Sequence, residues 1–155
     1  MQQGYDIVIA DTSCFILLNK IGELELLKSV FQTVCTTSII AEEFGNPLPD
    51  WIIIEELADD HTFQVLKLET EEGEASAIAL AIEKQNALLI LDDHKARKLA
   101  ARLQLLYTGT FGIILRAKQN GIISSVKPIL DKIAATNFRF SQSIYHEILS
   151  AAGEK

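Results

Sequence analysis

Aspartates directly follow two short apolar runs of the sequence, at places where carboxylates commonly do chemistry. Asp11 follows the run 7–10, and Asp92 and Asp93 follow the run 88–91. Both runs have the length and composition of strands that are buried between helices. Because ligands bind outside the carboxyl ends of the strands in open α/β sheets, we expect these aspartates at a functional edge.

Glutamates on two expected helices can reach the same edge. Glu42 and Glu43 lie in the helix that follows the second strand, and Glu74 lies in the first turns of the long helix 71–86. Glu74 precedes Ala75 and borders the apolar stripe of that helix. One of Glu42 and Glu43 is expected to be solvated helix surface. Acids from four separate segments can thus point toward one place.

Each acid also has a purely structural explanation when it is considered alone. We give equal weight to Asp11 as a cap of the following helix and to Asp11 as a functional group. Asp92 and Asp93 could form an ordinary polar turn. Glu71 and Glu72 are expected only to complement the helix dipole, at about 0.3–1 kcal/mol each.

The convergence of several carboxylates favours a divalent cation. Without one the carboxylates would repel one another, and some of their pKa values would rise at a cost to stability. Hard oxygen ligands suit Mg²⁺ or Mn²⁺, which also bind water and substrate phosphate oxygens. Such a site can bind a scissile phosphate and generate hydroxide from water. The reaction that fits best is phosphodiester hydrolysis.

Strands alternate with helices along the chain. The expected strands lie at 7–10, 33–36, 51–54, 88–91 and 105–107, and the expected helices lie at 14–21, 23–31, 71–86, 95–103 and from 110 to about 121. Thr12 or Ser13 can cap the first helix, and Thr37 or Ser38 the helix after the second strand. The pairing of strand 51–54 stays open. This alternation predicts an α/β fold with a parallel sheet sandwiched between helices.

Length and composition indicate one globular domain over residues 1–155, with a helical C-terminal part from about residue 124. Hydrophobic residues make up 48% of the chain, which argues against disorder. Cys14 and Cys35 are expected as small buried thiols in a reducing compartment. We find neither a signal peptide nor an apolar run of roughly 18–20 residues, and therefore expect a cytoplasmic protein without membrane association.

The formal net charge of −7 is an objection to nucleic-acid binding, because affinity for phosphate backbones comes mainly from Lys and Arg. A local basic strip could answer it. The helix after Asp93 carries Lys95, Arg97, Lys98 and Arg102, and Arg116 and Lys118 follow further on. The alternative is an ordinary solvated helix face. No aromatic-rich stacking surface is evident in the sequence.

Other site motifs are missing. The sequence contains no dinucleotide-binding or P-loop glycine pattern, no Cys/His zinc spacing and no nucleophile elbow. His61, His94 and His146 are isolated, and His94 is expected at the surface beside Asp93.

The order and spacing of these motifs resemble the PIN-domain nucleases, in particular PIN-like proteins related to the toxins of VapBC-type toxin–antitoxin pairs. The resemblance covers nearly the whole chain. Its segments are Ile9-Ala10-Asp11-Thr12-Ser13, Ser38-Ile39-Ile40-Ala41-Glu42-Glu43-Phe44, Gly73-Glu74-Ala75-Ser76-Ala77-Ile78-Ala79-Leu80-Ala81, Leu91-Asp92-Asp93-His94-Lys95-Ala96-Arg97 and Thr108-Gly109-Thr110-Phe111-Gly112.

This resemblance implies a PIN-like three-layer α/β/α fold and an endoribonuclease that depends on Mg²⁺ or Mn²⁺. It implies Asp11 as the first metal ligand, supported by the Thr12 and Ser13 hydroxyls. It selects Glu43 over Glu42, because the family's second acid stands before an apolar residue. Glu74 matches the third acid, and the fourth falls on Asp93 or its neighbour Asp92, with Asp93 preferred. Family members usually form homodimers and are silenced by a small antitoxin protein.

Two alternative functions compete with the nuclease. One is an aspartyl-phosphate site, although a phosphatase of that class needs a second aspartate at the position of Ser13. The other is a catalytically silent PIN-like module that acts through partner proteins and keeps its acids for structure or contact.

Overall fold

The computed structural model describes residues 7–154 and contains a parallel sheet with the strand order β3-β2-β1-β4-β5. The strands are β1 (Ile7–Ala10), β2 (Val34–Thr37), β3 (Ile52–Glu55), β4 (Ala87–Ile90) and β5 (Leu106–Thr108). Every neighbouring pair in the sheet is parallel. β1 therefore lies in the middle of the sheet. The chain then adds β2 and β3 on one side of it, and β4 and β5 on the other.

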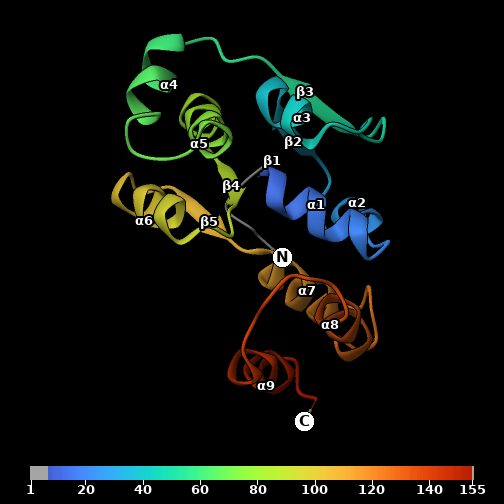
Figure 1. Ribbon diagram of the computed structural model, residues 1–155. Helices are drawn as coiled ribbons and strands as arrows, with labels where there is room; N and C mark the ends of the chain where they lie inside the picture. Colours follow the sequence, from blue (N-terminus) through green and yellow to red (C-terminus); the bar gives the residue numbers. More distant parts are fainter. Residues whose placement is uncertain (1–6, 155) are drawn as a thin grey trace.

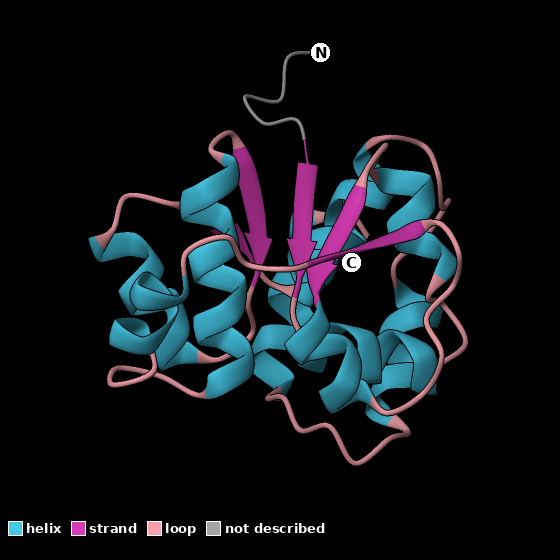
Figure 2. Cartoon of the chain, turned by 90° about the horizontal axis from the view of Figure 1, so that it is seen from above, coloured by secondary structure: helices cyan, strands magenta, loops and turns pink. Residues whose placement is uncertain are grey.

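Helices cover both faces of this sheet. They are α1 (Thr12–Lys20), α2 (Glu25–Val30), α3 (Ser38–Phe44), α4 (Asp60–Leu66), α5 (Glu72–Lys84), α6 (His94–Arg102), α7 (Thr110–Gln119), α8 (Lys127–Ala134) and α9 (Gln142–Ala151). Helices α4, α5 and α6 lie on one side, and α1, α2, α7 and α8 on the other (Figure 1). The turned view shows the strands in the middle of the molecule with helices around them (Figure 2). The predicted three-layer α/β/α fold is confirmed.

The long helix α5 packs on the sheet through small side chains. Ala75, Ala77, Ala79 and Ala81 are buried, and the helix contacts β1, β2 and β4. Short side chains let the helix axis lie close to the strands, where larger residues such as Ile78 fill the remaining space. Because α5 precedes β4 and packs along it, its first turn lies at the carboxyl edge of the parallel strands.

The structure corrects several details of the sequence prediction. Asp11, not Thr12 or Ser13, is the N-cap of α1, which begins at Thr12 rather than at residue 14. Helix α4 was missed, because it is short, polar and starts on the cap Asp59. The part after residue 124 is not continuously helical, because residues 135–141 form an irregular connection between α8 and α9.

Other expectations hold within the described residues. The strand predicted at 51–54 is the edge strand β3 and pairs with β2, which settles its open pairing. Cys14 and Cys35 are buried free thiols, and burial raises the pKa of both. No helix in residues 7–154 is long and apolar enough to cross a bilayer.

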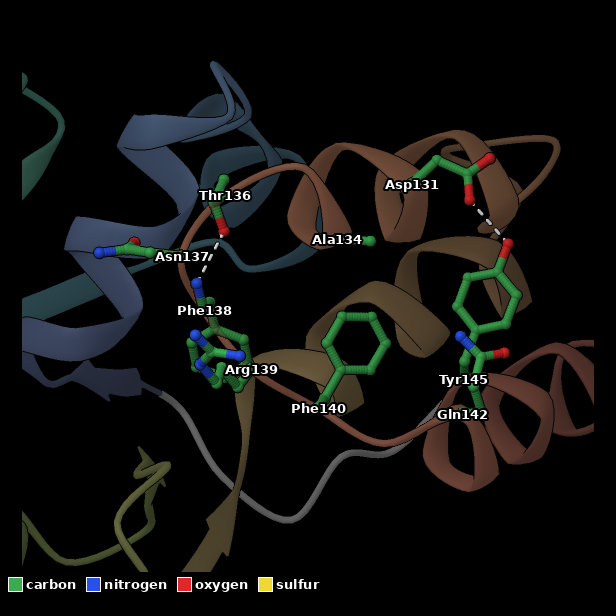
Figure 3. Close-up of a pocket in the computed structure, with 9 residues that line it drawn as sticks. All are labelled: Asp131, Ala134, Thr136, Asn137, Phe138, Arg139, Phe140, Gln142 and Tyr145. Carbon is green, nitrogen blue, oxygen red and sulfur yellow. Dashed lines mark hydrogen bonds between the residues drawn. The ribbon is translucent and has the colours of Figure 1, made fainter.

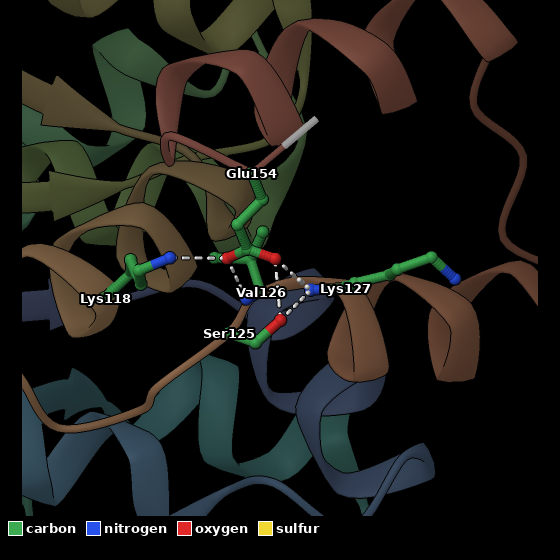
Figure 4. A network of polar contacts seen from close by, with 5 residues as sticks. All are labelled: Lys118, Ser125, Val126, Lys127 and Glu154. Carbon is green, nitrogen blue, oxygen red and sulfur yellow. Dashed lines mark hydrogen bonds and ion pairs between the residues drawn. The ribbon is translucent and has the colours of Figure 1, made fainter.

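The end of the chain is joined to the α7–α8 connection by one carboxylate, Glu154 (Figure 4). Its oxygens accept from the Lys118 ammonium (2.7 Å), the Ser125 hydroxyl (2.6 Å) and the backbone N–H of Val126 (2.6 Å). These donors lower the pKa of Glu154 to about 2, with the Lys118 contact as the largest cause. A carboxylate with several charge-assisted bonds holds its neighbours in place. Glu154 therefore fixes the C-terminal helices against one another.

We expect Glu154→Gln to lower the thermal unfolding temperature by several degrees at neutral pH, because an amide loses the ionic part of these bonds. The difference should shrink in acid, because the stabilisation is complete above the unfolded pKa near 4.5 and is lost as pH falls toward 2. Circular dichroism melts would measure it. Glu147→Gln, an exposed site on α9, is the matched control. Equal melting of both variants and wild type would contradict the role of Glu154.

Candidate functional site

Asp11 ends the central strand and is the most buried of the candidate acids. It is 2% exposed and follows β1 directly. One carboxylate oxygen accepts from the backbone N–H of Thr12 (2.7 Å), so the side chain caps α1. The structural role that the sequence left open is thus real. The other carboxylate oxygen of Asp11 accepts no hydrogen bond from residues 7–154.

Glu43, not Glu42, turns toward Asp11. The Thr12 hydroxyl donates to Glu43 Oε1 (2.5 Å), which joins α1 to α3. The Glu43 carboxylate also lies directly against Gly73, where a Cβ would overlap with it. Gly73 thereby allows the first turn of α5, with Glu74, to approach α3. Glu42 is exposed and forms no hydrogen bond or ion pair within the described chain.

Asp92 and Asp93 have different environments. Asp92 is half-buried and accepts from Thr110 through both the backbone N–H (2.8 Å) and the hydroxyl (2.6 Å). The Ser13 hydroxyl also lies 3.5 Å from Asp92 Oδ2. Asp93 is exposed and caps α6 by accepting from the Ala96 N–H (2.9 Å). Asp92 is the more firmly held acid, whereas Asp93 has more freedom to turn.

The acids are close enough for their charges to interact. Burial, and after it the charges of Glu74, Glu43 and Asp92, raise the pKa of Asp11 from 3.8 to about 7, although the hydrogen bond from the Thr12 N–H lowers it. Burial also raises the pKa of Glu74, with further repulsion from Asp93 and Glu43. All five acids that the sequence singled out therefore contribute to one negative field at the carboxyl edge.

Buried hydroxyls form a second layer under this edge, which the sequence prediction missed. Thr36 donates to the Ala10 carbonyl (2.9 Å), and the hydroxyls of Thr37 and Ser76 lie 2.7 Å apart. Thr37 also caps α3 by accepting from the Ile40 N–H (3.1 Å). The exception is the Thr37 cap, which the sequence prediction had offered as one of two candidates and which is confirmed. These contacts hold β1, β2, α3 and α5 together beneath the acids.

The donor set fits a hard divalent cation, although the carboxylates are not arranged as a closed shell. No three Asp, Glu, His or Cys side chains among residues 7–154 already lie in a metal-holding arrangement. Instead, Glu43, Asp92 and Asp93 accept protein hydrogen bonds. All available donors are oxygens, and Mg²⁺ characteristically takes one or two carboxylates and keeps several waters. The raised pKa of buried Asp11 is the cost that a cation would relieve.

The basic residues of α6 do not form one uniform strip. Lys95, Lys98 and Arg102 are exposed, whereas Arg97 is half-buried with its guanidinium 5.2 Å from the Tyr107 ring centre. Arg102 ends the helix that Asp93 caps, so it lies roughly 12 Å along the axis from the acids. Their part in RNA binding stays a prediction.

We expect Asp11→Asn to stabilise the metal-free protein above neutral pH, because the amide keeps an acceptor for Thr12 and cannot ionise. Folded Asp11 holds its proton to about pH 7, whereas the unfolded carboxyl loses it near 3.8. Wild-type stability should thus fall as pH rises through this window. The gain should be at least about 1 kcal/mol, or roughly 2–4 °C. Melts in EDTA at about pH 5 and about pH 8 would measure it.

Asp50→Asn, at an exposed loop position, removes the same charge and should change stability little. Equal melting temperatures of wild type and Asp11→Asn at the higher pH would show that burial and the neighbouring charges do not oppose the ionisation of Asp11.

Comparison with known proteins agrees with this geometry. Residues 7–154 match the sequence profile of a family described as a PIN domain. A search of curated proteins found no match to the chain. Because the profile spans nearly the whole described structure, the chain belongs to the PIN-domain family.

Proposed function

We propose that this protein is a metal-dependent endoribonuclease that hydrolyses RNA phosphodiester bonds at the acidic edge of its sheet. The observation that supports this most is buried Asp11, whose ionisation is opposed by Glu74, Glu43 and Asp92. Acids kept together at such a cost indicate a bound cation. The nuclease-type fold of the family agrees with this function.

Asp11, Glu43, Glu74 and Asp93 would hold Mg²⁺ or Mn²⁺, with Asp92 as an alternative or additional ligand. When bound, the cation would neutralise charge on the scissile phosphate and make water a stronger nucleophile. The protein's own contribution is orientation. Thr12 directs the Glu43 carboxylate, and Thr110 with Ser13 directs Asp92. Glycines at 73 and 109 let these acids approach the neighbouring backbone.

The two competing functions have weaker support. An aspartyl-phosphate site needs one exposed nucleophilic aspartate, but Asp11 is buried and Ser13 stands where the phosphatase class needs an acid. A catalytically silent module would agree with acids that are already hydrogen-bonded. Metal binding without RNA turnover would favour that module. The toxin role, a small antitoxin partner and a homodimer remain proposals that rest on the family.

We expect purified wild-type protein to cleave RNA in Mn²⁺ or Mg²⁺ and not in EDTA. Glu43→Gln should lower the rate at least roughly 100-fold, because it removes a charged ligand but keeps an acceptor for Thr12. A gel assay on varied RNAs would measure both rates. The matched control is Glu42→Gln, an exposed neighbour that should cleave like wild type. Equal residual cleavage by all proteins would indicate a contaminant and end the enzymatic claim.

We also expect Mn²⁺ to raise the melting temperature of wild type but not of Asp11→Asn. A ligand at 100 times its dissociation constant stabilises the folded state by about 2.7 kcal/mol. Removal of a central carboxylate should abolish most of that shift, since the cation loses its most buried partner. Thermal melts with increasing Mn²⁺ would test this separately from activity. An equal shift in both proteins would place the cation elsewhere.

A further inference from the structure

A cavity of about 320 Å³ lies beside the acidic site and shares Asp92 with it. Its other walls come from β5 and the start of α7, from Arg97 on α6, and from the connection between α8 and α9. Aromatic rings line it at Phe111, Phe138 and Phe140, and Arg139 lies among them. Ring centres of Phe111 and Phe140 are 5.2 Å apart, and those of Phe111 and Phe138 are 6.0 Å apart. The structure thus brings together partly buried aromatic rings that did not form an evident cluster in the sequence.

Arg97 brings to this cavity a guanidinium that packs on Tyr107 but forms no ion pair within the described residues. Its Nε is buried without a hydrogen-bond partner in the described chain. Gly109 has no side chain that could crowd these groups. A Cβ there would lie 3.7 Å from Arg97 Nη2 and only 2.9 Å from Asp92 Oδ1. A buried donor without an acceptor costs stability. The covered Nε itself is out of a ligand's reach, but Nη2 of the same guanidinium lies beside Gly109 on the cavity wall, where an anionic oxygen could pair with it.

The segment with Phe138, Arg139 and Phe140 is held in place at both ends. The Phe138 N–H donates to the Thr136 hydroxyl (3.1 Å), and Ser141 caps α9. The same residues also line a second cavity of about 560 Å³, together with Tyr145 and Asp131 (Figure 3). The same segment therefore separates the two cavities and presents side chains to both. An ordered segment of this kind can position rings for a ligand.

Arginines combined with aromatic rings are the chemistry that recognises nucleotides. Bases stack on aromatic rings regardless of sequence, and arginine pairs with phosphate. A volume of about 320 Å³ is at the small end of ligand pockets and suits one nucleotide rather than a folded RNA element. The shared Asp92 places such a nucleotide next to the acids. Arg97 and Arg139 also supply local positive charge in a chain with a net charge of −7.

We propose that this cavity binds one nucleotide of single-stranded RNA, with its base against Phe138 or Phe140 and its phosphate facing Arg97 and Arg139. The inference that the bound nucleotide belongs to RNA rests on the proposed nuclease function. The inference that the cavity binds a nucleotide does not. The cavity would select an unpaired nucleotide beside the bond to be cut.

The test is binding of a short fluorescent single-stranded RNA in EDTA, where no cleavage occurs. Phe140→Leu keeps an apolar side chain but removes the ring, and should weaken binding at least roughly 5-fold. Arg139→Gln should weaken binding and lower the slope of log affinity against log salt by about 0.7. Phe63→Leu and Lys67→Gln, on or next to α4 and outside the lining of the cavity, are the matched controls. Phe138→Leu replaces Phe140→Leu if that variant unfolds.

The outcomes separate this proposal from the nuclease. If wild type cleaves RNA in Mn²⁺ while the cavity variants bind RNA like the controls, the cavity assignment is wrong and the nuclease stands. If nothing is cleaved but the cavity variants alone lose RNA binding, the cavity stands and the nuclease falls. Adenosine monophosphate that binds as tightly as the RNA, with the same sensitivity to the variants, would overturn RNA as the source. Variants that lose a co-purified protein but not RNA would instead indicate a protein ligand.

Discussion

The buried carboxyl group of Asp11 is the constraint on which this edge of the molecule depends. It ends the central strand, so every neighbouring element of the sheet contributes to its surroundings. Burial and three other acids oppose its ionisation, and one backbone N–H from Thr12 partly compensates. An apolar residue would remove this cost, but it would also remove the cap that Asp11 gives to α1. In the proposed function, a bound cation would offset the cost of keeping this acid buried.

Hydroxyls and glycines determine where the surrounding acids lie. Thr12 and Thr110 each hold a carboxylate that comes from another element, and the side chains of Glu43 and Asp92 each lie against a glycine. The glycines leave room for the two carboxylates, and the hydroxyl hydrogen bonds hold each carboxylate in one rotamer. Glu43 accepts the Thr12 bond through one oxygen, whereas both oxygens of Asp92 accept hydrogen bonds. Such bonds orient the acids without neutralising their charge. The same feature explains why the acids share one field without forming a closed coordination shell.

The fold could be predicted from the sequence because its signals are local. The run 7–10 and the alanine-rich helix α5 have patterns that a parallel sheet requires, and the order of the elements then determines the layers. The candidate site was less accessible. Asp92 and Asp93 are adjacent in the sequence, and they differ because Thr110 from a later element binds Asp92 whereas Asp93 caps α6. The aromatic cavity was missed because Phe111 and Phe138–Phe140 meet only after α8 reverses the chain direction.

Asp92 links two surroundings of opposite charge. On one side lie the acids, which favour a cation; on the other lie Arg97 and Arg139, which favour an anion. A single ligand with one sign of charge would satisfy only one of these. In the proposed function, a phosphodiester accompanied by a divalent cation would satisfy both, because the carboxylates would hold the cation while the arginines would pair with phosphate. Such an arrangement would let a protein with a net charge of −7 bind a polyanion at one place.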